Sequence, residues 1–191
     1  MEKIRVGFAL CGSFCTFSKV IPQMMQLTVE GYDVFPIMSE TAFSTDTRFG
    51  TAESFIKKIH DITGHKIIHT ITDAEPIGPQ KMFDLLIIEP CTGNTLAKLA
   101  NGIADSSVTM AAKSHLRNSR PLVIAVSTND GLGVAAKNIG TLQNCKNVFF
   151  VPYSQDDPIA KPNSLVAIFD KTSDTIKCAL EYKQIQPVLN Q

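Results

Sequence analysis

DLLIIEPCTGNT, residues 84–95, joins a continuous apolar run to a cluster of small polar residues. The run at residues 85–88 is apolar on both faces, which is typical of a strand buried inside a parallel sheet. The polar cluster follows at once and begins residues 92–102, where apolar side chains recur with helical spacing. The sequence therefore predicts a strand, a short loop and a helix, with the loop at the carboxyl end of the strand.

The same alternation extends along the chain in both directions. Further strands are predicted at residues 4–10, 32–38, 66–71, 121–126 and 147–151, and further helices at residues 17–28, 51–62, 106–117, 133–144 and 173–183. Residues 152–163 contain three prolines and are expected to be irregular. The pattern predicts one doubly wound α/β domain spanning residues 1–191. Its Rossmann-like or flavodoxin-like parallel sheet should hold about six strands, with helices on both faces.

The charge balance excludes several classes of protein. The chain has 191 residues, with 18 Lys and Arg against 18 Asp and Glu, so its formal net charge is zero. Proteins that bind nucleic acid usually carry a basic excess, which is missing here. Disordered chains combine low hydrophobicity with high net charge, whereas this chain is 44% hydrophobic. A neutral chain also lacks charge repulsion between copies, so we expect a homo-oligomer.

The sequence indicates a reduced cytoplasmic protein. No apolar run approaches the ~20 residues of a membrane span, and the first residues lead directly into a strand, so we expect neither a membrane segment nor a signal peptide. The five cysteines are scattered, without a Cys-x-x-Cys pair. His65 and His69 would lie ~13 Å apart along a strand, so we expect no metal site.

Ligands of doubly wound sheets bind beyond the carboxyl ends of the strands. In the first such loop, Gly12 lets a ligand approach the backbone and Ser13 offers a hydroxyl at a helix N-terminus, which favours an anion. The motif Gly-x-Gly-x-x-Gly is missing, and an ordinary N-cap is the commoner interpretation of Ser13. The loop after residue 90 carries three small polar residues, Thr92, Asn94 and Thr95, whereas a helix cap needs only one. We interpret these three residues as a cradle for a phosphate or an oxyanion.

Two further loops contribute polar groups, and each leaves two interpretations open. Asn129 carries donors and an acceptor that suit the edge of a heterocycle, but it can equally form a plain turn before Asp130 and Gly131. Residues 39–50 form a long polar loop of the kind that covers sites. Within it, Arg48 can pair a substrate carboxylate or remain solvated.

Taken together, these loops resemble the motifs of one protein family. PCTGNT, residues 90–95, resembles the Pro-x-Ser-Ala-Asn-Thr motif of the flavoprotein family, which includes the homo-oligomeric flavin-containing cysteine decarboxylases. Residues 96–105 resemble the Ala-Lys-x-Ala-x-Gly-x-Ala-Asp run of that family. The resemblance implies a trimer, or a multiple of one. It also implies FMN as the cofactor, bound by Gly12, Ser13, Ser39, Thr41, Pro90, Thr92, Asn94, Thr95 and Asn129.

The chain also departs from this family at two places. VSTN, residues 126–129, stands where the family has Pro-Ala-Met-Asn, so only Asn129 is retained. The decarboxylases carry a histidine in the loop after the second strand, but residues 1–59 contain none. Ser44 lies near that place, and a serine hydroxyl is no general base near neutral pH. The sequence therefore disfavours a decarboxylase and identifies no catalytic residue.

Within the family, the tail resembles subunits from spore-forming bacteria, through VPYSQDDP at residues 151–158 and KPNSLVA at residues 161–167. This resemblance implies oxidation of dihydrodipicolinate to dipicolinate in the cytoplasm of the mother cell during sporulation. A second subunit, which resembles a pyridine-nucleotide dehydrogenase, would supply NADP. Arg48 and Ser44 are candidates for contact with the dicarboxylate substrate. Two alternatives stay open: a different FMN-dependent enzyme of the family, either a decarboxylase or a flavin prenyltransferase, and a non-catalytic partner with a relic flavin pocket.

Overall fold

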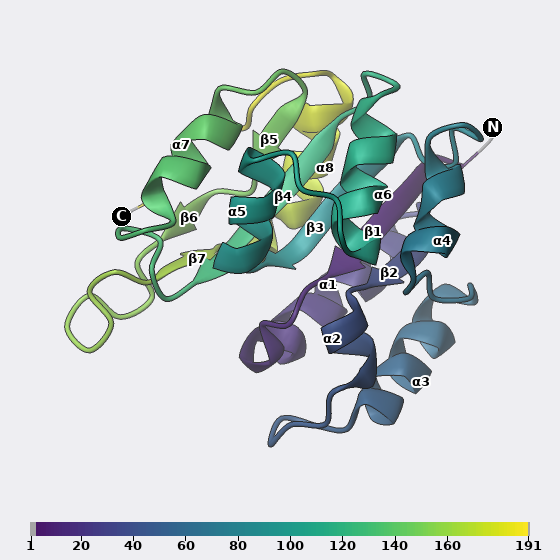
Figure 1. The fold of residues 1–191 in the computed structure, drawn as a ribbon, viewed down its shortest axis with the longest axis horizontal. Coiled ribbons are helices and arrows are strands. Elements are labelled where there is room, and N and C mark those ends of the chain that lie inside the picture. The colour runs from purple at the N-terminus through teal and green to yellow at the C-terminus, as the bar shows by residue number, and fades with distance from the viewer. Residues whose placement is uncertain (1–2, 191) are drawn as a thin grey trace.

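Five parallel strands form the centre of the computed structural model, which describes residues 3–190 (Figure 1). They are β1 (Arg5–Leu10), β2 (Asp33–Met38), β3 (Leu85–Cys91), β4 (Leu122–Thr128) and β5 (Val148–Phe150). Their spatial order is β2-β1-β3-β4-β5, the flavodoxin-like order. The predicted fold class, a doubly wound parallel sheet in one α/β domain, is confirmed.

Two short antiparallel strands extend the sheet beyond the prediction. β6 (Tyr153–Ser154) pairs with β7 (Leu165–Ala167), and β7 pairs with the end of β4 through Ser127 and Thr128. The sheet therefore has seven strands instead of about six, and it is not wholly parallel. Strands of two or three residues are too short to show a hydrophobic period, so the sequence left residues 152–163 as an irregular segment.

The predicted strand at residues 66–71 is wrong. Only one bridge, between Ile37 and Ile68, joins this segment to β2. The short helix α4 (Ile71–Ala74) begins where that strand should end, because the Thr70 side chain caps it by accepting from the Asp73 N–H. An apolar run packed on the sheet edge has the same local pattern as an edge strand.

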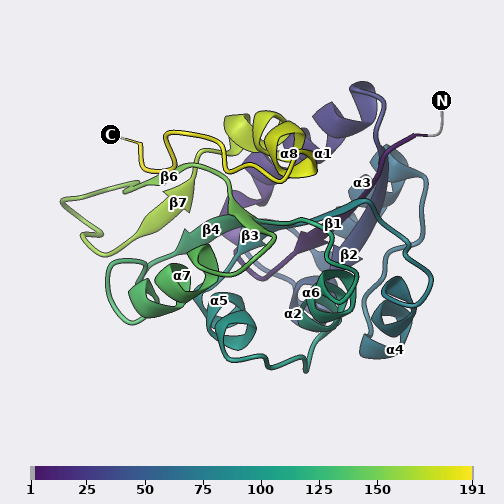
Figure 2. The same cartoon turned by 90° about the horizontal axis from the view of Figure 1, so that it is seen from above.

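Helices cover both faces of the sheet (Figure 2). α1 (Phe17–Val29), α3 (Ala52–Thr63) and α8 (Thr172–Leu180) lie on one face, and α4, α5 (Gly93–Ala100), α6 (Ser107–Leu116) and α7 (Ala136–Gln143) lie on the other. α2 (Glu40–Ser44) falls inside the predicted loop 39–50, and short 3-10 turns occupy Phe14–Thr16, Glu75–Ile77 and Phe169–Lys171. None of the described helices is long and apolar enough to span a membrane.

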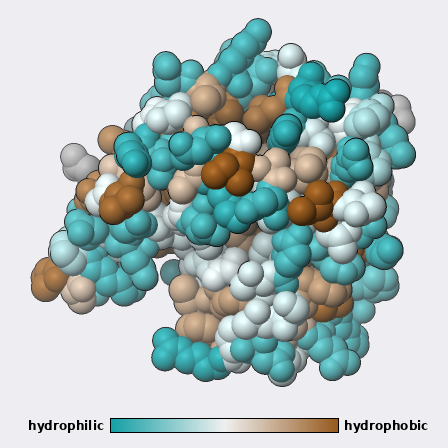
Figure 3. Space-filling view, in the orientation of Figure 1, coloured by the Kyte–Doolittle hydropathy of each residue, from teal (hydrophilic) through white to brown (hydrophobic). Residues whose placement is uncertain are grey.

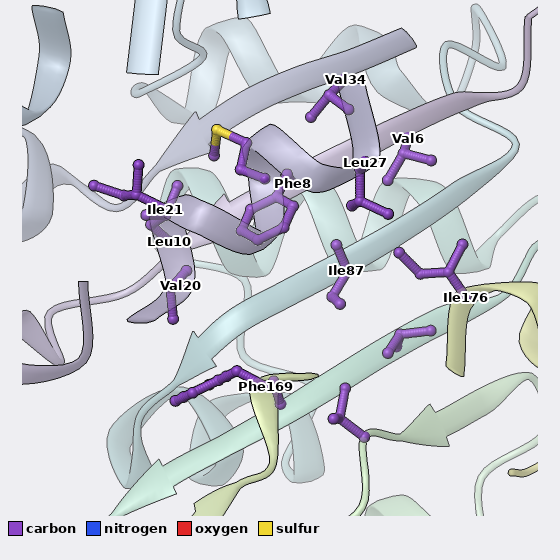
Figure 4. Packing of buried hydrophobic residues seen from close by; sticks show 14 of the residues in the cluster. Val6, Phe8, Leu10, Val20, Ile21, Leu27, Val34, Ile87, Phe169 and Ile176 are labelled. Carbon is purple, nitrogen blue, oxygen red and sulfur yellow. The ribbon is translucent and has the colours of Figure 1, made fainter. Parts of the chain in front are cut away.

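Alternate residues of each strand face the two helical layers and build two apolar cores. Phe8 and Ile87 lie side by side in β1 and β3 and pack beneath Leu27 of α1 and Ile176 of α8 (Figure 4). Ile88, the next residue of β3, faces the opposite layer. This alternation follows from the period of two along a strand. The sheet is thereby a rigid base for the loops at its carboxyl edge.

Candidate functional site

The loops that follow β1, β2, β3 and β4 meet at the carboxyl edge of the sheet. The Cys11 N–H donates to the Pro90 carbonyl at 3.2 Å, which ties the end of β1 to that of β3. The Ser39 N–H donates to the Leu10 carbonyl at 2.9 Å, which ties in the end of β2. β1 and β3 flank the switch point of this strand order, where ligands of such sheets bind.

Two adjoining cavities open at this point, and Gly12 and Thr92 line both of them. The β2-side cavity, of about 600 Å³, is lined by Cys11, Gly12, Ser39, Glu40, Thr41, Ile71, Thr92, Asn94, Thr95, Lys98, Asp105 and Ser106. The β4-side cavity, of about 430 Å³, is lined by Gly12, Ser13, Phe14, Cys15, Thr16, Thr47, Phe49, Thr92, Gly93, Ser127, Thr128, Asn129, Asp156, Lys161, Ser164 and Val166. The two cavities thus lie on either side of one shared wall.

The three polar residues at the start of α5 have different roles. The Thr92 hydroxyl accepts from the Thr95 N–H at 3.3 Å, as an N-cap does, and lies 3.1 Å from the Thr95 hydroxyl. Thr95 donates to the Cys11 sulfur at 3.2 Å. Asn94 is exposed, and among residues 3–190 its side chain has no hydrogen-bond partner. Asn94 is therefore the member of this group whose amide is available to a ligand.

The charged groups of the β2-side cavity are already paired. The Glu40 carboxylate accepts from the Ser107 N–H at 2.9 Å and so stabilises the first turn of α6. Lys98 and Asp105 form an ion pair at 2.8 Å, and the hydrogen bond from Lys98 lowers the pKa of Asp105. An anion entering here meets two carboxylates that are each neutralised or hydrogen-bonded.

The buried thiols at this edge are chemically quiet. Burial raises the pKa of Cys11 to about 11, and burial also raises the pKa of Cys91 well above its usual value. Both thiols therefore stay protonated at neutral pH. Because only the thiolate is a strong nucleophile, neither cysteine is expected to react. Their role is packing.

The β4-side cavity combines hydroxyls, an amide and two aromatic rings. The Ser13 and Ser127 hydroxyls lie 2.8 Å apart, so they connect the loop after β1 to the end of β4. Asn129 is exposed, and Phe14 and Phe49 also line this cavity. Lys161 and Asp156 are the charged residues among its described lining residues.

Gly93 has a packing role that the sequence could not reveal. A Cβ at this position would lie 2.7 Å from the Thr128 hydroxyl oxygen and 2.9 Å from Asp130 Oδ1. Thr128 donates a hydrogen bond to Asp130, so these two groups form one fixed contact. The glycine lets the start of α5 pack directly against the loop after β4.

Most of the predicted cofactor residues come together. Gly12 and Thr92 line both cavities, Ser39, Thr41, Asn94 and Thr95 line the β2-side cavity, and Ser13 and Asn129 line the β4-side cavity. Pro90 is buried within β3 and lines neither cavity, although its carbonyl accepts from Cys11.

The two predicted substrate residues lie outside both cavities. The Arg48 guanidinium lies 4.9 Å from the centroid of the Phe49 ring, and the side chain is exposed. Ser44 donates to the Glu40 carbonyl at 2.7 Å, within the last turn of α2. Arg48 thus adjoins the β4-side cavity through its neighbour in sequence, Phe49, and Ser44 is engaged in its own helix.

Several lining residues were missed from the sequence. Lys161 and Asp156 reach the β4-side cavity because β7 pairs with β4, a contact between segments far apart in the chain. Glu40 was not predicted either, and no local pattern distinguishes a charge that accepts from the first turn of a distant helix.

Comparison with known proteins shows the family to which the chain belongs. A family model described as Flavoprotein matches residues 1–177. The B subunit of dipicolinate synthase from Bacillus subtilis (strain 168) is 48% identical over 185 residues, which cover 97% of this chain and 92% of that protein. The crystal structure of the B subunit of dipicolinate synthase from Bacillus halodurans has 44% identity and a TM-score of 0.91, covering 100% of this chain and 99% of the other.

A more distant structure shows the fold alone. Burkholderia xenovorans DmrB, crystallised in complex with FMN and described as a cubic protein cage for redox transfer, has a TM-score of 0.69 at 16% identity. The comparison covers 94% of this chain and 97% of that one.

Proposed function

Since this chain belongs to the flavoprotein family, we propose that it is an FMN-binding B subunit of dipicolinate synthase and acts in the oxidation of dihydrodipicolinate to dipicolinate. The observation that carries the proposal is the pair of cavities sharing Gly12 and Thr92 at the switch point of the sheet. The similarity to the Bacillus subtilis protein over nearly the full length supports the choice of reaction.

The β2-side cavity suits the phosphate of FMN. Asn94 lies in the first turn of α5, where backbone N–H groups and the helix dipole favour an anion. The Thr41 hydroxyl is exposed beside it and has no hydrogen-bond partner among the described residues. The Gly12 backbone is open to a ligand, because a Cβ there would meet only ordinary contacts at 3.5 Å or more.

The β4-side cavity suits a flat ring and a small substrate beside it. Phe14 and Phe49 offer apolar surfaces, and the Asn129 amide offers both donors and an acceptor to a polar ring edge. A bound flavin supplies a hydride acceptor. The residues of this chain hold the ring and the substrate in register, which lowers the entropic cost of the reaction.

The proposal includes partners. The A subunit of dipicolinate synthase would bring NADP, and the loss of a hydride equivalent and a proton would make the ring aromatic. We propose a homo-oligomer, a trimer or a multiple of one, located in the cytoplasm of the mother cell. The name of the Bacillus subtilis relative, which marks it as one part of a larger enzyme, and the cage formed by DmrB support assembly in this family.

A second candidate is a non-catalytic partner with a relic flavin pocket. Two observations favour it: Ser13 bonds to Ser127, and Thr92 bonds to Thr95, so these hydroxyls are satisfied without a ligand. A decarboxylase or a flavin prenyltransferase has less support. None of the histidines lines either cavity in the described part of the chain, and burial lowers the pKa of His115 to about 4.

Flavin uptake tests the cofactor part of the proposal. The purified chain, titrated with FMN, should quench flavin fluorescence and retain a visible flavin spectrum after gel filtration. Asn94→Asp adds a negative charge at the start of α5 and should weaken FMN binding about tenfold or more. Asn144→Asp makes the same change at the exposed C-cap of α7 and should leave the affinity unchanged. A chain that takes up no FMN would refute the cofactor assignment.

An assay of the two mixed proteins tests the reaction. Dipicolinate formation should require both this chain and its NADP-binding partner, and it should depend on FMN. Activity that needs this chain but is indifferent to FMN, and unchanged by Asn94→Asp, would favour the relic pocket.

A further inference from the structure

The segment between β6 and β7, residues 155–164, forms one wall of the β4-side cavity. The Leu132 N–H donates to the Asn163 carbonyl at 3.0 Å, and the Ser164 hydroxyl donates to the Thr128 carbonyl at 3.3 Å. These bonds fasten the segment to the loop after β4. In the space-filling view, the surface is hollowed between this protruding segment and the part of the chain that holds the start of α1 and the loop after α2 (Figure 3). The wall is therefore a built part of the site.

Lys161 is anchored within this segment at its backbone. The Lys161 N–H donates to the Asp157 carbonyl at 2.8 Å, and the Ala160 N–H donates to Asp157 Oδ1 at 2.9 Å. These bonds form a turn that Asp157 closes through its side chain. The position from which the lysine side chain extends is thus set by local hydrogen bonds, independent of the ion pair that the side chain makes.

The Lys161 ammonium retains binding capacity. Its Nζ lies 3.1 Å from Asp156 Oδ2, and an ammonium has three donors, so a single carboxylate leaves others free. The side chain is 54% exposed, so the pair lies at the cavity mouth and is not sealed in the interior. The hydrogen bond to Asp156 raises the pKa of Lys161, which keeps the group cationic near neutral pH.

The rest of the cavity is neutral. Apart from Asp156, its other described lining residues offer hydroxyls, an amide, a thiol and aromatic or aliphatic surfaces. The chain as a whole has zero net charge and supplies no general field for anions. Lys161 is therefore the one cationic side chain among the described residues that line this cavity, with Ser13, Ser127 and Asn129 as neutral hydrogen-bonding groups.

We propose that Lys161 binds a carboxylate of the substrate and makes the β4-side cavity selective for a small ring compound that carries carboxylates. The inference rests on the proposed function, because it assigns the substrate end of the same site. Asp156 orients the ammonium and competes with the substrate for it. A carboxylate that arrives beside Phe14 and Phe49 exchanges part of the Asp156 contact for its own.

Titration calorimetry with pyridine-2,6-dicarboxylate, in the presence and absence of FMN, tests this inference. Lys161→Met should raise the Kd about tenfold or more, and Lys161→Arg should stay within about threefold of the wild type. Lys177→Met is the matched control, since Lys177 forms a similar ion pair with Glu30 at 3.3 Å and is 55% exposed, outside both cavities. Its Kd should equal that of the wild type.

Asp156→Asn distinguishes substrate binding by Lys161 from a purely structural role of the Lys161–Asp156 ion pair. If Lys161 binds the substrate, removal of the competing carboxylate should leave the Kd unchanged or lower it. If the ion pair only braces the segment, Asp156→Asn and Lys161→Met should weaken binding alike, which would overturn the proposal. A wild-type chain that does not bind the dicarboxylate, or an effect of Arg48→Met with none of Lys161→Met, would overturn it as well.

The same titrations distinguish this inference from the proposed function. If the chain takes up no FMN but binds the dicarboxylate through Lys161, the cofactor assignment fails and the Lys161 assignment stands. If FMN binds and Lys161→Met does not change the Kd of the dicarboxylate, the Lys161 assignment fails and the cofactor assignment stands.

Discussion

Glu89 is an ionisable residue in an apolar core. It lies in β3, is fully buried, and its Oε2 accepts a hydrogen bond from the Thr172 hydroxyl of α8 at 2.7 Å. Its second oxygen, Oε1, has no hydrogen-bond partner among the described residues. Burial raises the pKa of Glu89 to about 8, against which the Thr172 hydrogen bond acts weakly. The side chain is therefore a neutral acid at neutral pH, one residue before the Pro90–Thr95 motif.

A prediction at this scale concerns pH. Since the folded pKa lies above the unfolded value, the folded state binds more protons between the two, and the free energy of unfolding falls as the pH rises from about 4.5 to about 8. Glu89→Gln keeps the shape and the acceptor for Thr172 but cannot ionise. In urea unfolding, the variant should therefore lose less stability than the wild type between about pH 5 and about pH 9. Equal pH slopes in the two proteins would contradict the assignment.

Contacts between elements place the two cavities. α5 begins against the loop after β4 because Gly93 has no side chain, and β7 carries residues 155–164 to the same place by pairing with β4. The outer edge of β5 is closed in another way, because the Gln184 side-chain amide both accepts from the Phe150 N–H and donates to the Phe150 carbonyl, each at 2.8 Å. That amide acts as a substitute for a neighbouring strand and protects the edge from pairing with another chain.

The α5 contact leads to a second prediction. Gly93→Ala would force a Cβ to within 2.7 Å of the Thr128 oxygen, so we expect a loss of about 1–3 kcal/mol in the free energy of unfolding and weaker FMN binding. Gly140→Ala is the matched control. Gly140 lies in α7 with nothing within 4 Å of the added Cβ, and the change should stabilise the protein by about 0.5–1 kcal/mol. Urea unfolding measures both. A neutral Gly93→Ala would show that the loop after β4 moves freely.

The zero net charge of the whole molecule favours association between copies of the chain. Copies of a neutral chain do not repel one another, and apolar side chains such as Val29, Val134 and Ile159 are exposed at 76%, 73% and 95%. Burial of such side chains between protomers would stabilise an oligomer by about 1.5–3 kcal/mol each. The homo-oligomer expected from the composition stays a prediction.

The corresponding prediction concerns mass in solution. Light scattering coupled to gel filtration should give a trimer or a multiple of one, stable to added salt, because burial of apolar surface is not screened by ions. A monomer across the accessible concentration range would contradict the expected assembly.

Local patterns were sufficient for the order of the five parallel strands and the longer helices, and they placed the predicted cofactor residues at one edge of the sheet. Runs such as residues 85–88 and the helical spacing after Thr92 report burial directly, because each side chain's exposure follows from its place in a repeating element. Parallel strands bring their carboxyl ends to one edge, so eight of the nine predicted cofactor residues line the two cavities there.

Other features depend on contacts between segments far apart in the chain, and no local pattern encodes them. β6 and β7 are too short to carry a period, and residues 66–71 have the composition of a strand without its pairing. Glu89 is neutral because it is fully buried, with Thr172 of α8 against it, and Lys161 reaches the cavity because β7 pairs with β4. Burial, ionisation and proximity at these positions arise from long-range packing, which a sequence read along its length does not contain.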